Sequence, residues 1–376
     1  MIYLDNASTT KVFSSSADIM HKACTVDFFN PSATYKAGIN VKNLINNARK
    51  NIAQSLGCDD CELYFTSCAT ESNNWIFNSV LKNQRQNFII SAGEHASIYE
   101  PAIALKNKGF DLRIAPLKKD GSVNVEKLLE LVDENTALVS VIHCSNETGV
   151  INDIYSISRT IKMKNQKTLF HSDGVQAFLK TDFSLKNSDV DFYSISGHKV
   201  GAPKGIGALY INKTVSKNAF ILGGGQENAM RSGTENVPAI LAFSDAVDNF
   251  INKVNFQKIH QLSEYLEKLL LQIEDVKIVS FTAERCGFIS CIVAKGIKAE
   301  VVQTMCADAG VMIGRGSSCS SKKAGNRVLA NMGLTQFEID GALRISIGVD
   351  TTENDINYAV DIIEKCILQM RGKKIG

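Results

Sequence analysis

A histidine and a lysine follow a predicted β-strand in the stretch Ser196-Gly197-His198-Lys199. The strand, residues 191–196, contains aromatic and β-branched residues, and a Gly/Pro-containing loop comes after the lysine. Ligands of open α/β sheets bind at the carboxyl ends of strands, so Lys199 lies where a ligand would bind. A partly buried lysine amine tends towards a lowered pKa and can form an imine with a carbonyl group. Taken alone, a lysine is more often solvent-facing.

Polar residues also follow four other predicted strands. These strand ends are Ser67-Cys68-Ala69-Thr70, Glu94-His95, Asn146-Glu147-Thr148-Gly149 and Asp173-Gly174-Val175-Gln176. The first opens a predicted helix, whose positive end can bind phosphate through backbone N–H groups and hydroxyls, although Thr70 could simply cap the helix. Asp173 could cap a turn. It could also keep the ring nitrogen of an aromatic cofactor protonated, which makes the ring an electron sink.

Short apolar runs alternate with amphipathic stretches over the first two thirds of the chain. The runs are residues 62–67, 87–91, 111–117, 137–143, 168–173, 191–196 and 206–212. This alternation predicts an α/β fold with a mainly parallel seven-stranded sheet and helices on both faces. After Gly223-Gly224-Gly225 the pattern changes to a long helical stretch reaching about Ile273. Strands at 288–294 and 342–349, with helices near 299–310 and 353–371, predict a smaller α+β domain.

Composition points to a small ligand. The 376 residues carry 41 Lys and Arg against 39 Asp and Glu, a net charge of +2, which favours neither a nucleic-acid nor a membrane partner. No stretch approaches the ~20 apolar residues that span a bilayer, and the start lacks a secretory signal, so we expect a cytoplasmic protein. Ten scattered cysteines suit reduced thiols. The single CxxC at Cys58 and Cys61 has no second pair nearby, so no metal site is expected.

Ordered motifs along nearly the whole chain resemble one known family, the NifS/IscS-like cysteine desulfurases of the class V aminotransferase type. The matching stretches are YLDNASTT (3–10), NPSATYKAG (30–38), FTSCATESNN (65–74), EHAS (94–97), NETG (146–149), SDGVQA (172–177), SGHKVGAPKGIGALY (196–210), GGGQENAMRSGTEN (223–236) and ALRISIG (342–348). The resemblance implies the fold type I of pyridoxal-phosphate (PLP)-dependent transferases. It also implies a large PLP-binding domain at residues 15–255 and a small domain formed by residues 1–14 and 256–376.

The resemblance assigns a cofactor role to ten residues. Lys199 would carry PLP, Asp173 would pair with the pyridine nitrogen, and Gln176 would contact the ring hydroxyl. His95 would stack on the ring and assist proton transfer, and Asn146 would lie near the ring and the substrate. The phosphate would be held by Ala69, Thr70, Ser196 and His198. Thr234 is expected to reach the phosphate of a neighbouring subunit. That contact implies a homodimer with shared active sites.

Two further residues would handle the substrate, L-cysteine. Arg344 is expected to bind its carboxylate through a bidentate pair, a geometry that guanidinium suits. Cys319, in GRGSSCSSKKAG (314–325), resembles the cysteine that a mobile loop brings to the substrate sulfur in this family. The implied reaction converts L-cysteine to L-alanine and leaves the sulfur on Cys319 as a persulfide. A sulfur-acceptor protein in iron–sulfur cluster or thiolation pathways would then take it.

Two positions depart from the family pattern, and other functions remain open. Cys68 replaces a usual glycine, which would strain the chain if that backbone needed a positive φ, and Tyr35 replaces a frequent histidine.

A selenocysteine lyase or an aminotransferase could use the same fold. An aminotransferase would not need Cys319. A non-catalytic docking protein in sulfur trafficking is a further alternative, which has no physical need for Lys199, Asp173, His95 and Cys319 together.

Overall fold

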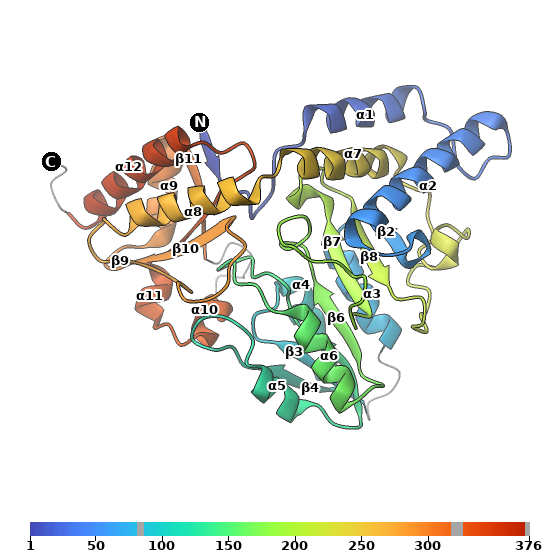
Figure 1. Ribbon diagram of the computed structural model, residues 1–376, viewed down its shortest axis with the longest axis horizontal. Helices are drawn as coiled ribbons and strands as arrows, with labels where there is room; N and C mark the ends of the chain where they lie inside the picture. The colour runs from blue at the N-terminus through green and yellow to red at the C-terminus, as the bar shows by residue number, and fades with distance from the viewer. Residues whose placement is uncertain (81–85, 317–325, 373–376) are drawn as a thin grey trace.

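Two β-sheets organise the chain, which the computed structural model describes over residues 1–80, 86–316 and 326–372 (Figure 1). The larger sheet has the strand order β2-β8-β7-β6-β5-β3-β4. Strand β8 runs antiparallel to its neighbours β2 and β7, whereas all other neighbours in this sheet are parallel. The predicted α/β fold with a mainly parallel seven-stranded sheet is therefore confirmed.

The strands of this sheet coincide with the seven apolar runs of the sequence. They are β2 (Leu63–Thr66), β3 (Asn87–Ser91), β4 (Asp111–Ala115), β5 (Thr136–Ser140), β6 (Leu169–Asp173), β7 (Phe192–Ser196) and β8 (Gly207–Ile211). Every residue of β3, β5 and β7 is buried. Central strands are apolar throughout because helices cover both faces of the sheet, which leaves no face for polar side chains.

Helices cover the large sheet on both sides (Figure 1). They are α1 (Ser14–Thr25), α2 (Lys36–Leu56), α3 (Ala69–Val80), α4 (Ala96–Asn107), α5 (Val125–Leu131), α6 (Ile154–Lys164) and α7 (Val237–Lys253), with short 3-10 turns η1 (Asp60–Glu62), η2 (Gly197–Lys199) and η3 (Glu227–Ala229). Helix α3 packs on β7 and β8, and its first turn lies at the carboxyl end of β2. The sheet and α3 thus bring several strand ends and one helix N-terminus together.

The smaller sheet, of order β1-β11-β12-β10-β9, contains more strands than the sequence predicted. Its strands are β1 (Ile2–Leu4), β9 (Val276–Ile278), β10 (Ile289–Ala294), β11 (Val311–Arg315) and β12 (Ala342–Ser346), and its helices are α8 (Phe256–Leu270), α9 (Ala299–Asp308), α10 (Arg327–Asn331), α11 (Gln336–Asp340) and α12 (Glu353–Met370). Only β10 and β12 were expected. Strands β1, β9 and β11 are too short for their sequences to show a strand pattern. They become strands because they pair with neighbouring strands.

The predicted helical stretch reaching about Ile273 consists of two helices, α7 and α8. Helix α7 ends where Val254 turns extended (φ −68°, ψ 129°), and Asn255 then caps α8 by accepting a hydrogen bond from the Lys258 N–H. Asn and Asp readily take this role because their side-chain oxygen replaces a missing helical acceptor. The break leads the chain from the large sheet to the small one (Figure 1).

The N-terminal strand belongs to the C-terminal sheet. Strand β1 pairs in parallel with β11, in the register Ile2 to Val311 and Leu4 to Ile313. Residues 5–13 then cross to α1, which packs on α7. The proposed division into residues 15–255 and residues 1–14 with 256–376 follows this path, and it stays a proposal.

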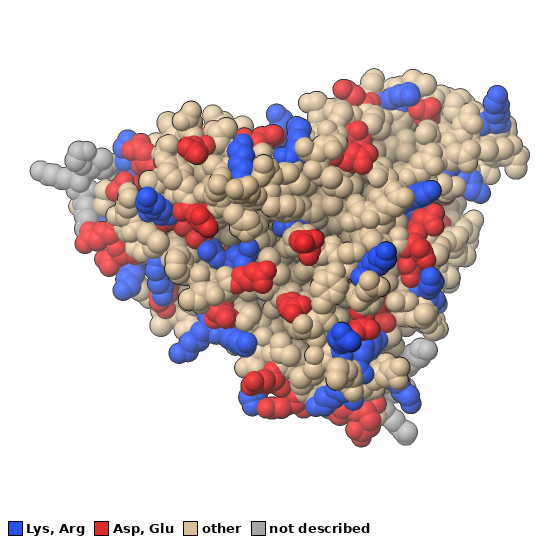
Figure 2. Space-filling model, viewed as in Figure 1, with Lys and Arg blue, Asp and Glu red and all other residues tan. Residues whose placement is uncertain are grey.

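The visible surface mixes both signs of charge, as the balanced composition predicts (Figure 2). Within residues 1–80, 86–316 and 326–372, no helix is long and apolar enough to cross a membrane.

Replacing Trp75 should test the core between α3 and the large sheet. Trp75 is fully buried, stacks on Phe220, and donates its indole N–H to the Asn218 carbonyl oxygen at 3.0 Å. We expect Trp75→Ala to lower the free energy of unfolding by about 3–5 kcal/mol, and Trp75→Phe by roughly 2 kcal/mol, since it keeps an aromatic ring. Urea titration followed by circular dichroism measures both. A loss below about 1 kcal/mol for Trp75→Ala would contradict this packing.

Candidate active site

Lys199 ends the 3-10 turn that follows β7, and its amine points at the N-terminal segment. Its Nζ donates to the carbonyl oxygens of Ala7 at 2.6 Å and Ser8 at 2.7 Å. Gln176 donates its Nε2 to the same Ala7 oxygen at 2.8 Å. Two residues predicted from separate strand ends therefore meet at one short loop. The sequence motif YLDNASTT marked this loop but did not indicate that its carbonyl groups face the lysine.

Asp173, the last residue of β6, is buried and accepts two hydrogen bonds. One comes from the Val175 N–H at 3.0 Å and the other from Asn73 Nδ2 at 3.0 Å. Asn73 Nδ2 also lies 2.8 Å from Ser97 Oγ, which in turn lies 2.9 Å from His95 Nδ1. A continuous chain of contacts therefore joins the two predicted residues Asp173 and His95 through Asn73 and Ser97.

His95 caps helix α4, and several charges act on its imidazole. Burial lowers the pKa of His95, Asp173 opposes this, and the positive charges of Lys199, Arg327 and Arg344 lower it further. The net result is a lowered pKa, so the ring is neutral at physiological pH. Because these charged groups all influence one ring, the structure brings the strand-end residues and Arg344 to a common site.

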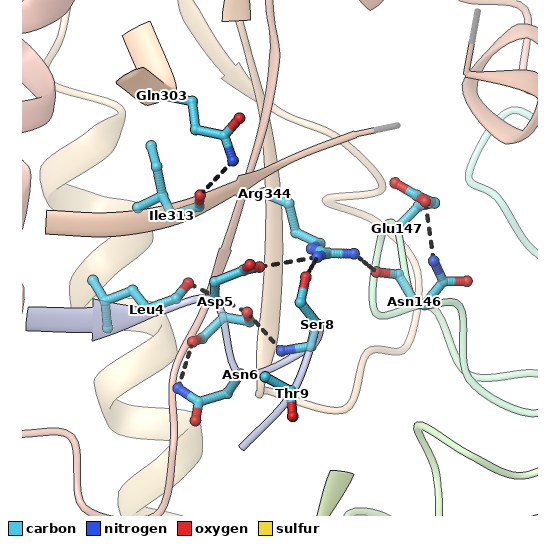
Figure 3. A network of polar contacts seen from close by, with 12 residues as sticks. Leu4, Asp5, Asn6, Ser8, Thr9, Asn146, Glu147, Gln303, Ile313 and Arg344 are labelled. Carbon is cyan, nitrogen blue, oxygen red and sulfur yellow. Dashed lines mark hydrogen bonds and ion pairs between the residues drawn. The ribbon is translucent and has the colours of Figure 1, made fainter. Parts of the chain in front are cut away.

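Arg344 lies in β12 of the small sheet and is almost fully buried. Its Nη1 donates to the Asn146 carbonyl oxygen at 2.9 Å, and its Nη2 donates to Asp5 Oδ1 at 3.0 Å and Ser8 Oγ at 2.6 Å (Figure 3). A Cβ at Gly314 on the adjacent strand would lie 2.6 Å from Asp5 Oδ1, so only glycine leaves room for this ion pair. Arg344 is thus held from both sheets.

The predicted phosphate-binding residues gather where β2 and β7 end. Ala69 is the first residue of α3, and Thr70 lies exposed in its first turn rather than capping it. Ser196 ends β7 with a buried hydroxyl that has no hydrogen-bond partner among the described residues. Burial and the nearby Lys199 charge lower the pKa of His198 to about 4. The Cys68 backbone is outside the positive-φ region, so cysteine fits there without backbone strain.

Glu94, beside His95, is a buried carboxyl group, and only one of its two oxygens has a hydrogen-bond partner among the described residues. Its Oε1 accepts from Ser91 Oγ at 2.7 Å and from the Ile142 N–H at 2.6 Å, while Oε2 has no hydrogen-bond partner among the described residues. Burial raises the pKa of Glu94 to about 8 despite these hydrogen bonds and the Arg327 charge. Glu94 is therefore protonated near neutral pH.

Two predicted site residues, Thr234 and Cys319, and the departure at Tyr35 remain apart from these contacts. Thr234 is exposed on the loop before α7, and Tyr35 is exposed before α2. Cys319 lies outside the described residues. The neighbouring Asn326 donates to Glu147 Oε2 at 3.2 Å, and Arg327 donates to the carbonyl oxygens of Ala92 and Glu94. The chain therefore resumes, after residues 317–325, at the site.

Sequence reasoning gave no role to four residues of this site. Asp5 and Ser8 lay in a recognised motif, and Asn73 and Ser97 lay in two others. Their contacts join segments that are far apart in the chain, such as Asp5 with Arg344. A local signal was the amide of Asn73 on the buried side of α3, beside Trp75, Ile76 and Phe77.

The family model described as Aminotransferase class-V matches residues 2–358. The chain belongs to this family. A Methanosarcina thermophila protein named Cysteine desulfurase IscS is 31% identical over 98% of this chain and 93% of its own length. A solved NifS-like protein is 32% identical, with a TM-score of 0.91, and covers 97% of this chain and 98% of its own. A structure of SspA in complex with cysteine is 28% identical, with a TM-score of 0.82 over 92% of this chain and 99% of its own. The resemblance to NifS/IscS-like proteins and their fold is confirmed.

The protonation of Glu94 predicts how stability depends on pH. A carboxyl group whose pKa rises from 4.5 when unfolded to about 8 when folded stabilises the protein at low pH, and this contribution is lost as pH rises through 8. Glu94→Gln keeps the uncharged shape and removes the titration. Between about pH 6 and about pH 9 the parent protein should lose roughly 2–3 kcal/mol more stability than Glu94→Gln does.

Chemical denaturation at both pH values measures this difference. Glu100→Gln, on the exposed side of the same helix, is the matched control and should behave like the parent protein. Equal pH dependence of Glu94→Gln and the parent protein would show that Glu94 ionises normally.

Proposed function

We propose that this protein is a PLP-dependent cysteine desulfurase that converts L-cysteine to L-alanine and transfers the sulfur to Cys319 as a persulfide. The observation that carries this proposal is the meeting of Lys199, Asp173 and Arg344 around the neutral ring of His95. An amine, a buried carboxylate and a buried guanidinium are the groups needed for an aldehyde cofactor and an amino-acid substrate.

The residues present fit PLP. The unpartnered Ser196 hydroxyl, with the first turn of α3 and His198, suits a phosphate group. Lys199 would hold the aldehyde covalently, Asp173 the ring nitrogen and Gln176 the ring hydroxyl. Bound PLP supplies an electron-withdrawing ring that stabilises negative charge at the substrate α-carbon. Thr234 would reach the phosphate of a partner subunit in a homodimer, which accounts for its exposed position here.

Arg344 would bind the substrate carboxylate, with Asn146 beside it. A guanidinium has five N–H groups, and three of those on Arg344 are used by Asn146, Asp5 and Ser8. The Nε N–H has no hydrogen-bond partner among the described residues, and a carboxylate bound by Nε and Nη2 together would take the place of the Ser8 hydroxyl. The ion pair with Asp5 holds the guanidinium in place before substrate arrives, which reduces the entropy cost of binding.

Cys319 would take the sulfur in a balanced exchange. Its thiolate attacks the substrate sulfur, the S–S bond forms, and the Cβ–S bond breaks. The electron pair of that bond stays with Cβ, which takes up a proton and becomes the methyl group of alanine. Acceptor thiols can then remove the sulfur from the persulfide, because persulfides are reversible. We propose a cytoplasmic enzyme that serves an iron–sulfur or thiolation pathway.

Two related reactions could use the same site residues. A selenocysteine lyase would use the same lysine and arginine, and an aminotransferase would leave Cys319 unused. A non-catalytic docking protein has no need for the buried contacts of Arg344 or Asp173. The curated relatives named cysteine desulfurase favour the first proposal.

Adding L-cysteine to the purified, PLP-loaded protein tests the function. We expect alanine and sulfide in equal amounts when a reducing thiol is present. Lys199→Ala and Cys319→Ala should each reduce this activity to background, because one removes the amine and the other the sulfur acceptor. Cys24→Ala, at an exposed cysteine of α1, should match the parent protein. Keto-acid formation that survives Cys319→Ala would instead indicate an aminotransferase.

Changing Arg344 to lysine tests its role in substrate binding. Lysine keeps the charge but cannot form a bidentate pair, and it also loses the shared contacts with Asp5 and Asn146. We expect the KM for L-cysteine to rise about tenfold or more, equivalent to at least about 1.4 kcal/mol, with a smaller change in kcat. Steady-state alanine production measures both constants. Arg371→Lys, at the end of α12, is the control, and an unchanged KM for Arg344→Lys would refute the assignment.

A further inference from the structure

Four side chains from three elements form one line of hydrogen bonds beside the large sheet. They run from Asp173 in β6 through Asn73 in α3 and Ser97 in α4 to His95 at the α4 cap. Asn73 is fully buried, and Asp173 and Ser97 are 3% and 8% exposed. Solvent water therefore has little access to these contacts, and each donor must be matched by an acceptor within the line.

The carboxylate determines the direction of the two hydrogen bonds made by Asn73. A carboxylate accepts hydrogen bonds and cannot donate them, so Asn73 must turn its NH₂ group towards Asp173. The same Nδ2 lies 2.8 Å from Ser97 Oγ, so it donates its second proton there. The Ser97 hydroxyl accepts from Asn73 and still has its own proton to donate to His95 Nδ1, 2.9 Å away.

The backbone adds a second donor to the same ring nitrogen. The Ser97 N–H lies 3.2 Å from His95 Nδ1, in the cap of α4. A backbone N–H cannot reverse its role, unlike a hydroxyl. Two donors therefore meet at Nδ1, which must carry a lone pair, and the single proton of a neutral imidazole belongs on Nε2.

We propose that Asn73 and Ser97 are positioning residues: the Asp173 carboxylate orients the Asn73 amide, and the donors of Ser97 hold the His95 ring neutral with the proton on Nε2. Where a proton sits on His95 follows from the contacts of this chain alone. What His95 does with it rests on the proposed function: the ring offers an N–H donor to an anionic group of the substrate, such as its sulfur. In this state His95 is not a base at Nε2.

Removing the Ser97 hydroxyl should raise the pKa of His95. A donor to the unprotonated Nδ1 stabilises the neutral ring, so losing it favours the imidazolium and raises the pKa of His95. One hydrogen bond corresponds to a shift of about half a unit to one unit. The charged groups that act on the ring are Asp173, which favours the imidazolium, and Lys199, Arg327 and Arg344, which oppose it. All four stay in place in Ser97→Ala.

Nitrogen NMR of the protein labelled with ¹⁵N-histidine, before PLP is added, tests the proposal without any activity. The chain has six histidines, and loss of one signal set in His95→Gln assigns the ring. We expect the Nε2–H tautomer in the parent protein and an upward pKa shift of about half a unit to one unit in Ser97→Ala. Ser97→Thr, which keeps the hydroxyl, should restore the parent value.

Ser79→Ala is the matched control, because it removes a buried hydroxyl of α3 that has no hydrogen-bond partner among the described residues. It should leave the His95 signals unchanged. An Nδ1–H tautomer in the parent protein would overturn the proposal. So would a Ser97→Ala protein that titrates like Ser79→Ala.

The PLP-loaded protein with L-cysteine tests the proposed function separately. If the parent protein makes no alanine at all, the proposed function fails, and the NMR result still decides where the proton lies.

Discussion

The pairing of β1 with β11 is the constraint on which the rest of the site depends. It anchors the first residues of the chain in the C-terminal sheet, and residues 5–10 then pass between the two sheets. This short segment is fixed at both sides. The Ala7 N–H donates to Ser346 Oγ at 2.9 Å on the small sheet, and Thr10 Oγ1 donates to the His198 carbonyl oxygen at 3.0 Å beside Lys199. Without this crossing, Lys199 would lose its contacts with Ala7 and Ser8, and Arg344 would lose those with Asp5 and Ser8.

The electrostatics of the site favour anionic ligands. Lys199, Arg327 and Arg344 bring positive charge to it, while burial raises the pKa of both Glu94 and Glu147 and so favours their uncharged forms. A buried carboxyl group becomes neutral because the low-polarity interior solvates a charge poorly. The positive charge of these groups suits the anionic phosphate and carboxylate of the proposed function.

A neutral histidine in this setting needs a specific cause, and two causes act together. Burial and three nearby cations disfavour the imidazolium, and the line from Asp173 through Asn73 and Ser97 places donors on Nδ1. The first cause determines the charge of the ring, and the second determines which nitrogen holds the proton. The same buried carboxylate would therefore serve the cofactor ring and the histidine.

The sequence alone determined the large sheet and the strand-end residues. Seven apolar runs of strand length, separated by helical periodicity, leave few other arrangements, and polar residues at carboxyl ends of parallel strands must meet at one edge. Lys199, Asp173 and His95 could be found in this way, with the ordered motifs supplying the family. Strands β1, β9 and β11 could not be found, because three to five residues of ordinary composition become strands only through their partners. Only the tertiary structure decided that Asp5 holds Arg344, that Ala7 and Ser8 face Lys199, and that Asn73 and Ser97 join Asp173 to His95. The reason is physical: side-chain hydrogen bonds act over about 3 Å, and residues far apart in sequence come within that distance only when the elements that carry them pack together.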